Sequence, residues 1–290
     1  AHEYYNKLQQ LSYSPFKIYR CCQHNVAMTW PWFVENLWQA SADGGLVAWM
    51  YAGSTVTAMV GDNSKVTIAE ETDYPFTGEI QLRMQTESPV EFPLYLRVPR
   101  WCLGMVISVN GEPIDVNAGP GRYVRLARIW ADGDLVQIHM PMTLALTTWP
   151  RTGSVTIDRG PLSYSVKIDE RYERCGGTDE WPEWEIFPAS PWNYGLALSS
   201  ESLITEAVIH ERGVDASQPW TLDKAPIEIE VSARRIPEWG LVNETVDVLR
   251  TSPVRSDADP GTITLVPLGC ARLRMSCLPT IGDDPDARDW

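Results

Sequence analysis

The sequence predicts a mainly β protein with two β-sandwich domains, and two patterns carry this prediction. Between about residues 45 and 170, turn residues recur roughly every eight to twelve positions between short runs rich in Val, Ile, Leu and Tyr, which is typical of a sandwich or barrel. Within the runs, residues such as Ile80, Leu82 and Met84 alternate with polar neighbours, so each strand has one apolar face. A second layer must cover these faces.

Two dipeptides predict tight hairpins between neighbouring strands. Asn110-Gly111 separates two short apolar runs, and both residue types tolerate the positive φ that such a turn requires. Asp132-Gly133 lies between the runs 126–130 and 135–140 in the same way. We therefore expect each pair of runs to form a hairpin.

The segment 25–42 has a helical period instead. Thr29 is a suitable N-cap, which would place Pro31 in the first turn, where its missing N–H costs little. Asp43-Gly44-Gly45 supplies a stop signal. A helix with one apolar side needs other helices to pack against, and the chain offers none of comparable quality. The apolar stripe consists of Val26, Trp30, Phe33, Val34, Leu37 and Trp38.

Residues 174–193 are rich in Trp, Pro and Gly and predict a long connection. Its residues Trp181, Trp184 and Trp192 suit either packing over the end of a sandwich or stacking on sugar rings, and both interpretations stay open. The segment 282–290 is an acidic tail that is expected to fray. Strand-like runs occupy 203–210, 227–231, 263–266 and 271–278.

Composition excludes several classes of partner. The 290 residues include 24 Lys and Arg against 38 Asp and Glu, a net charge of −14, whereas nucleic-acid binding needs clustered basic residues. No apolar run is long enough to span a membrane, and no signal peptide is visible. We expect a soluble protein, either cytoplasmic or exported with a signal outside this chain.

The sharpest local feature is the cysteine pair Cys21-Cys22, followed by His24. Neighbouring cysteines do not readily bond each other, so they are buried thiols, metal ligands or partners in distant disulfides. Zinc usually takes four ligands, and a fourth is not obvious beside these three. Glu173-Arg-Cys175 has a ligand-like spacing that we interpret as coincidental. Cys102, Cys270 and Cys277 are predicted core residues, whereas His2, His139 and His210 have no partner pattern.

The order of motifs along the chain resembles glycoside hydrolase family 127, formerly domain of unknown function 1680. The likeness covers nearly the whole chain, and the ordered series is more specific than any single piece. The motifs are the Cys-Cys-x-x-Asn element, GLVAWMYAGSTV, FPLYLRVPRWC, VNGEPIDV, GRYVRLARIWADGDLVQIHMPM, RGPLSYSVKI, WPEWEIFPASPWNYGL and ITLVPLGCARLRMSCLP.

This resemblance implies an (α/α)6 barrel followed by two β-sandwiches, with the chain returning to the first sandwich for its last strand. Only the C-terminal part of that arrangement has a counterpart here. The implied domains are a helical remnant of the barrel at 1–42, a first β-sandwich at 43–150 plus 260–281, a second β-sandwich at 151–259 and the tail at 282–290.

The resemblance also implies a chemistry. Members are retaining exo-glycosidases that act on β-L-arabinofuranosides, with a cysteine nucleophile that corresponds to Cys21 and a zinc ligand that corresponds to Cys22. A metal would keep the Cys21 thiol ionised at neutral pH, so that it takes the role of the second carboxylate in most retaining enzymes. The glycan is expected to be neutral and to contact His24, Trp184 and Trp192.

The sequence departs from the family where the remaining active-site groups should lie. The other zinc ligands, a Glu-x-Cys element, and the acid/base glutamate come from upstream, but Glu3 is the only carboxylate before Cys21. His24 stands where characterised members have proline. We therefore expect part of a cysteine-dependent glycosidase that is inactive alone and whose partner is the missing barrel. The alternative is a non-catalytic β-sandwich that binds carbohydrate or supports another domain.

Overall fold

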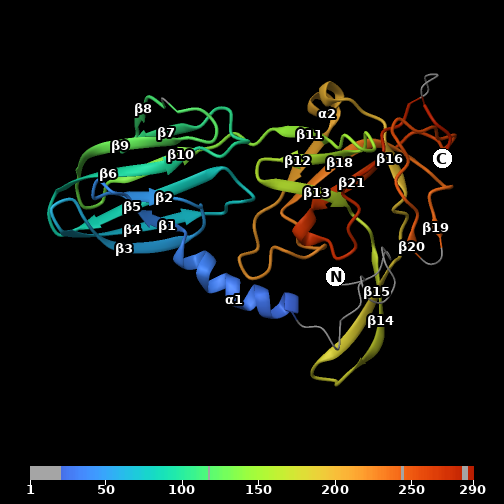
Figure 1. Cartoon of the computed structure of the whole chain (residues 1–290), viewed down its shortest axis with the longest axis horizontal. Coiled ribbons are helices and arrows are strands. Elements are labelled where there is room, and N and C mark those ends of the chain that lie inside the picture. Colours follow the sequence, from blue (N-terminus) through green and yellow to red (C-terminus); the bar gives the residue numbers. More distant parts are fainter. Residues whose placement is uncertain (1–20, 117, 243–244, 283–286) are drawn as a thin grey trace. The chain divides into compact units, whose positions relative to one another are not determined.

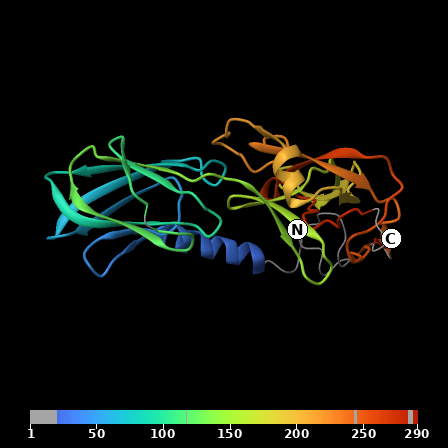
Figure 2. The same ribbon diagram turned by 90° about the horizontal axis from the view of Figure 1, so that it is seen from above.

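The computed structural model describes residues 21–116, 118–242, 245–282 and 287–290. Strands dominate it (Figures 1 and 2), which confirms the mainly β prediction. The chain divides into a first unit, Arg20–Met142, and a second unit that contains Thr143–Trp290. None of the helices in the described ranges is long and apolar enough to cross a membrane.

The first unit is a sandwich of two sheets. Their orders are β1-β2-β6-β9 and β3-β4-β5-β10-β7-β8, and buried residues of both sheets, such as Leu94 and Ile138, form one core. Alternation predicted the strand faces correctly, since Ile80, Leu82 and Met84 are all buried. The strands are β1 (Trp38–Ala40), β2 (Leu46–Ala48), β3 (Ser54–Val60), β4 (Ser64–Thr72), β5 (Glu79–Thr86), β6 (Val90–Arg97), β7 (Val106–Val109), β8 (Glu112–Ile114), β9 (Tyr123–Trp130) and β10 (Leu135–His139).

The helix before this sandwich differs from its predicted span. Helix α1 occupies Cys21–Glu35 with Pro31 inside it, so Thr29 is not its N-cap and the predicted end at residue 42 was wrong. The Asn36 backbone N–H donates to the carbonyls of both Trp32, at 3.2 Å, and Phe33, at 3.1 Å. The Asn36 side-chain amide also donates to Trp32 O, at 2.8 Å. These bonds close the helix, and Trp38 begins β1.

One predicted hairpin is confirmed and the other was wrong. Asn110 and Gly111 have φ values of 54° and 83° and join β7 to its partner β8. Gly133 also has a positive φ, of 82°, but β9 pairs with β6 and β10 pairs with β5 and β7. The Asp132-Gly133 turn therefore crosses between the sheets, because the apolar sides of β9 and β10 face the core from opposite layers.

One strand pair in the first unit is parallel. Strand β2 pairs with β6 in the register Leu46 with Leu94 and Ala48 with Leu96, although all the other strand pairs described in this unit are antiparallel. Parallel partners cannot be joined by a tight turn. The segment between them forms β3, β4 and β5 of the opposite sheet, so the pair ties the two layers together.

Replacing Trp130 with alanine is expected to destabilise the first unit by about 3–5 kcal/mol. The side chain is fully buried, and its indole N–H donates to Phe92 O at 3.0 Å, so the change leaves a cavity and removes this hydrogen bond. Urea unfolding followed by tryptophan fluorescence measures the loss. The control is Ile129→Ala at the exposed neighbouring position, and equal losses for the two variants would contradict the prediction.

The second unit is built on a seven-stranded sheet of order β11-β12-β13-β21-β18-β16, with β17 also paired to β18. Two hairpins, β14-β15 and β19-β20, lie outside it. The strands are β11 (Leu144–Thr148), β12 (Val155–Arg159), β13 (Leu162–Val166), β14 (Glu170–Gly177), β15 (Pro182–Pro188), β16 (Tyr194–Leu196), β17 (Val208–Glu211), β18 (Ile227–Arg235), β19 (Leu241–Val242), β20 (Thr245–Val246) and β21 (Gly261–Pro267), with a short 3-10 helix η2 (Leu268–Cys270).

The predicted return of the chain to the first sandwich was wrong. Strand β21 pairs with β13 and β18 inside the second unit, where Leu265 is buried opposite Ile229. The boundary also moves, because β11 pairs with β12 and so brings residues 143–150 into the second unit. Alternation predicts a strand with one apolar face but does not say which sheet it joins.

Three further local predictions need correction. Most of the predicted connection 174–193 is the hairpin of β14 and β15. Part of the predicted strand 203–210 is helix α2 (Ser200–Glu206), which a capping box of Ser199 and Ser202 initiates. The described end of the tail does not fray, since the Arg288 N–H donates to Pro253 O at 3.0 Å and the Trp290 ring lies 5.0 Å from that of Trp239.

Candidate functional site

The predicted catalytic and metal-binding cysteines open helix α1. Cys21 and Cys22 are its first residues, and their side chains lie outside the part of the structure that is described. His24, one residue beyond Gln23, is exposed. The helix thus places the three predicted residues within its first turn, and their roles stay predictions.

The apolar stripe on α1 is exposed rather than packed. Val26 is 67% and Trp30 63% exposed, whereas Leu37, beyond the end of the helix, is buried in the sandwich. Exposed apolar side chains at this density mark a surface that contacts another protein segment. The expectation that the helix has further helices as neighbours stays a prediction.

The other cysteines do not form a metal site. Among the described residues, no group of three or more His, Cys, Asp or Glu side chains is placed to hold a metal ion. Cys102 and Cys270 are buried free thiols, as predicted, and Cys175 is an exposed one on β14. The half-buried Cys277 has its Sγ 3.0 Å from Ser154 Oγ. His139 and His210 are exposed and pair with Glu79 and Glu230; His2 lies outside the described residues.

The three tryptophans predicted to stack on sugars have different surroundings. Trp181 is highly exposed between β14 and β15, and Trp184, on β15, is partly exposed and packs edge-on against Tyr172. Trp192 follows β15 and packs edge-on against Trp239, with ring centroids 5.4 Å apart. Trp192 also lines a cavity of about 460 Å³, whereas Trp181 and Trp184 do not. The tryptophans therefore form no single stacking surface.

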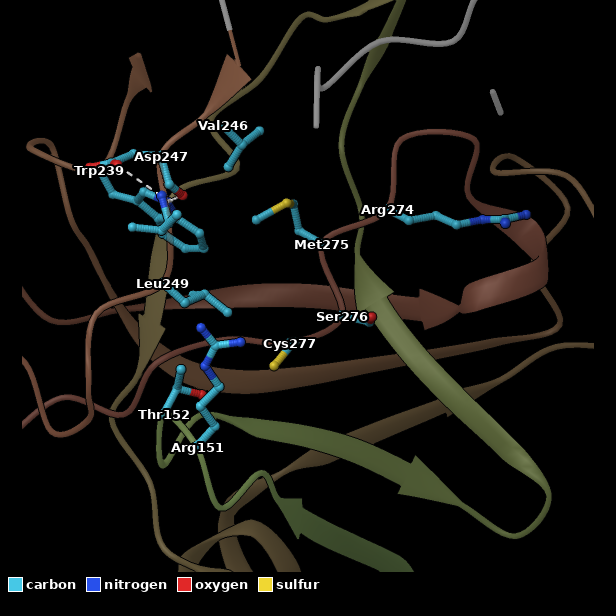
Figure 3. Close-up of a pocket in the computed structure, with 11 residues that line it drawn as sticks. Arg151, Thr152, Trp239, Val246, Asp247, Leu249, Arg274, Met275, Ser276 and Cys277 are labelled. Atoms are coloured by element: carbon cyan, nitrogen blue, oxygen red, sulfur yellow. Dashed lines mark hydrogen bonds between the residues drawn. The ribbon is translucent and has the colours of Figure 1, made fainter. Parts of the chain in front are cut away.

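A larger cavity of about 620 Å³ lies in the second unit (Figure 3). The Arg151 guanidinium lies beside Leu249 and Cys277, and the Arg274 side chain points away from them. The Trp239 indole N–H donates to Asp247 O at 3.0 Å. The described lining is Arg151, Thr152, Trp239, Val246, Asp247, Val248, Leu249, Arg274, Met275, Ser276 and Cys277.

The side chains of this cavity do not suit glycoside hydrolysis. Retaining enzymes need a nucleophile and an acid/base group on opposite sides of the bond that is cleaved. The only carboxylate in the described lining is that of Asp247, and its Oδ1 accepts the Val248 N–H at 2.8 Å. No histidine is among the lining residues described, so the Cys277 thiol has no general base there.

Sequence reasoning missed a cluster of three rings on the first unit, which we call the aromatic patch: Trp49, Tyr95 and Tyr123. Together with Ser41 and Val47 they line a cavity of about 280 Å³. The sequence signal that could have revealed this cluster was the alternate spacing of its residues along the strands. Val47 and Trp49 share one side of β2 and its extension, and their partner strand β6 carries Tyr95 opposite Val47.

Three solved structures share the fold. A GH127 β-L-arabinofuranosidase from Geobacillus stearothermophilus T6 is 24% identical, with a TM-score of 0.60 over 89% of this chain and 36% of that one. A glycoside hydrolase is 19% identical, with a TM-score of 0.62 over 94% and 44%. A GH127 β-arabinofuranosidase is 20% identical, with a TM-score of 0.64 over 94% and 41%. The chain has the fold of part of a glycoside hydrolase and spans less than half of each of these proteins.

Part of the sequence matches a family model. Residues 45–142 match the family described as β-L-arabinofuranosidase, GH127 middle domain, and this segment coincides with the first sandwich after its β1 strand. No curated protein matches the chain. This match confirms the predicted resemblance to the C-terminal portion of GH127.

Proposed function

We propose that this chain is the C-terminal part of a retaining glycoside hydrolase that acts on arabinofuranoside-like glycans through the nucleophile Cys21. The match of residues 45–142 to the GH127 middle domain carries the proposal. The Cys21-Cys22 pair supports it, because it opens the helix that leads directly into that domain.

In this mechanism the sulfur of Cys21 attacks the anomeric carbon of the sugar. The carbon–oxygen bond breaks as the carbon–sulfur bond forms, and the leaving oxygen takes a proton from an acid group outside this chain. Water, deprotonated by the same group, then displaces the sulfur as thiolate and releases the sugar with its original anomeric configuration. His24, Trp184 and Trp192 are proposed contacts for the glycan, and their partial or full exposure supports this role.

Zinc is the metal that the donor set favours. Consecutive cysteines offer the soft sulfur ligands that zinc accepts, so Cys21 and Cys22 fit half of a four-ligand site. When bound, zinc would hold the Cys21 thiol in its ionised form at neutral pH. The remaining ligands are proposed to come from outside the chain.

We expect the 290-residue chain alone to show no turnover of an aryl β-L-arabinofuranoside, because a nucleophile without its acid group cannot protonate the leaving oxygen. The same chain joined to the upstream barrel region should contain zinc by elemental analysis and release product of retained configuration by NMR. Cys22→Ala should lower the zinc content of that protein, with Cys175→Ala as the control at an exposed thiol. Turnover by the pure chain, or a joined protein without zinc, would contradict the proposal.

The second candidate is a non-catalytic module that binds carbohydrate. The aromatic patch favours it, since exposed rings on a β-sandwich suit sugar binding. The two candidates separate experimentally, because a binding module would retain glycans without hydrolysing them even when it is joined to the upstream region.

A further inference from the structure

The aromatic patch lies on the outer side of the four-stranded sheet of the first unit. Tyr95 on β6 is paired with Arg125 on β9, and Arg97 with Tyr123, so Tyr95, Tyr123 and Arg125 project from the same side of the sheet. Their neighbours Leu94, Val124 and Leu126 are buried in the core. Trp49 is 45% and Tyr123 37% exposed, and the rings face solvent.

Two of the rings lie nearly parallel, and the backbone positions that carry them are fixed. Trp49 and Tyr123 are stacked, with centroids 6.3 Å apart and planes inclined by only 23°. The backbone of Trp49 is held by a bond from its N–H to Leu37 O, at 3.0 Å, and Tyr123 begins strand β9. Aromatic side chains held in this way lose little conformational entropy when a ligand binds. The C–H face of a sugar ring packs on such a surface.

A hydrogen-bonded group of polar side chains borders the rings. The Tyr95 hydroxyl donates to Asp43 Oδ2 at 2.7 Å and accepts from Arg125 Nε at 3.0 Å. Arg125 Nη2 donates to the same Asp43 oxygen at 3.2 Å, and the Ser41 hydroxyl donates to Asp43 Oδ1 at 2.5 Å. Hydrogen bonds from Ser41 and Tyr95 lower the pKa of Asp43 to about 2. The Asp43 carboxylate therefore stays ionised throughout the neutral pH range.

The charge of these polar side chains bears on which kind of ligand would bind beside the rings. Asp43 and Arg125 neutralise each other, so this hydrogen-bonded group itself offers no net charge to a phosphate or a uronic acid; Arg97, opposite Tyr123 on the same side of the sheet, is not part of the group. Two of the five N–H donors of the Arg125 guanidinium are used in the bonds to Tyr95 and Asp43. The other three have no hydrogen-bond partner among the described residues and can reach hydroxyl groups. Among the described residues, the Trp49 indole N–H also has no hydrogen-bond partner. Rings beside directed donors, of which the charged one is already paired with Asp43, suit a polyhydroxylated, uncharged ligand.

We propose that the aromatic patch is a binding site for a neutral glycan chain, with a sugar ring stacked on Trp49 and Tyr123 and its hydroxyl groups bonded to Arg125. The site requires neither Cys21 nor a metal. It would hold a polysaccharide substrate on the protein rather than cleave it. The proposed function enters this proposal at one point only: it is the reason that arabinan is one of the polysaccharides tested below.

Affinity electrophoresis in gels that contain soluble arabinan, galactan or xylan tests the proposal on the whole 290-residue chain. At least one of these neutral polysaccharides should retard the wild-type protein, and polygalacturonate should not. Trp49→Ala should weaken binding by about tenfold or more, which corresponds to roughly 1.4 kcal/mol. Tyr123→Ala should have a similar effect, and Tyr95→Phe a smaller one, because it removes only the bonds that orient Arg125.

Ile129→Ala is the matched control. It removes an exposed apolar side chain from the same strand and the same side of the sheet as Tyr123, roughly 20 Å away at the rise of a β-strand, and should leave retardation unchanged. Circular dichroism and thermal unfolding check that each variant is folded. Trp184→Ala tests whether the glycan binds at the contact proposed for Trp184 instead of at the aromatic patch.

Any of the following binding results would overturn the proposal: no retardation by any neutral polysaccharide, equal retardation of Trp49→Ala and the wild type, loss only in Trp184→Ala, or stronger binding to polygalacturonate. A change in oligomeric state of Trp49→Ala in size-exclusion chromatography would instead make the patch a protein contact and would also overturn it. None of these results bears on the Cys21 mechanism, which turnover and zinc content test separately.

Discussion

Replacing Glu70 with glutamine is expected to remove most of the stability loss that the wild-type protein undergoes as the pH rises from about 4.5 to about 8. Glu70, on strand β4, is only 3% exposed. Its carboxyl group accepts bonds from the Ala52 N–H, at 3.0 Å, and the Ser54 hydroxyl, at 3.3 Å. These bonds favour the charged form, but burial outweighs them and raises the pKa of Glu70 from 4.5 to about 8.

The sign of the effect follows from proton binding. Between the two pKa values the folded protein keeps the proton on Glu70 whereas the unfolded chain has lost it, so each increase in pH favours unfolding. Stability from this group is fully present below about pH 4.5 and is lost as the pH passes through about 8. The total is on the order of 3–5 kcal/mol. Glutamine has the shape of the neutral acid and does not ionise.

Urea unfolding of both proteins across this pH range measures the effect, and the difference between the two stability curves isolates Glu70 from the other titrating groups. Glu71→Gln is the matched control, since it removes the same charge from the next, exposed position on the same strand. Parallel curves for the wild type and Glu70→Gln would show that burial does not hold this carboxyl in its neutral form.

Replacing Cys21 with alanine, in the chain joined to its upstream barrel region, is expected to lower turnover of an aryl β-L-arabinofuranoside by roughly 10⁴-fold or more, as removal of a nucleophile does in other covalent enzymes. The thermal unfolding midpoint should hardly change, because the residue opens a helix whose nearby side chains are exposed. The proposed mechanism also predicts that a slow substrate labels Cys21 covalently, which mass spectrometry of the peptide detects.

Cys175→Ala is the control for this experiment, because it removes an exposed free thiol on strand β14. Turnover by this variant should match the wild type. If Cys21→Ala retained substantial turnover, or if the label were found on another side chain, Cys21 would not be the nucleophile and the resemblance to GH127 would extend to fold alone.

Local signals in the sequence predicted individual strands and turns better than they predicted which strands pair with each other. The Asn110-Gly111 turn and the alternation of Ile80, Leu82 and Met84 depend on adjacent residues, and both are confirmed. Asp132-Gly133 provides the same turn geometry, yet its flanking strands join different sheets. Strand β21 likewise joins a sheet that its own pattern does not specify. Pairing between distant strands depends on the packing of the whole core.

The same difference between local and long-range signals applies to the candidate sites. The Cys21-Cys22 pair was visible because two neighbouring cysteines are unusual in a sequence. The aromatic patch was not, since Trp49, Tyr95 and Tyr123 are far apart in the chain and become neighbours only when β2, β6 and β9 lie side by side. Aromatic residues at single positions are indistinguishable from core residues until the pairing is known.

The parallel pairing of β2 with β6 also sets an order of events in folding. Strands β3, β4 and β5 pair with their neighbours in sequence and can associate as soon as they exist. Strand β2 can pair early with β1, but its pairing with β6 must wait for that strand and closes a longer loop. Strand β9 then completes the sheet by pairing with β6. During synthesis on the ribosome, Trp49 is therefore made well before its stacking partner Tyr123, which comes only near the end of the first unit.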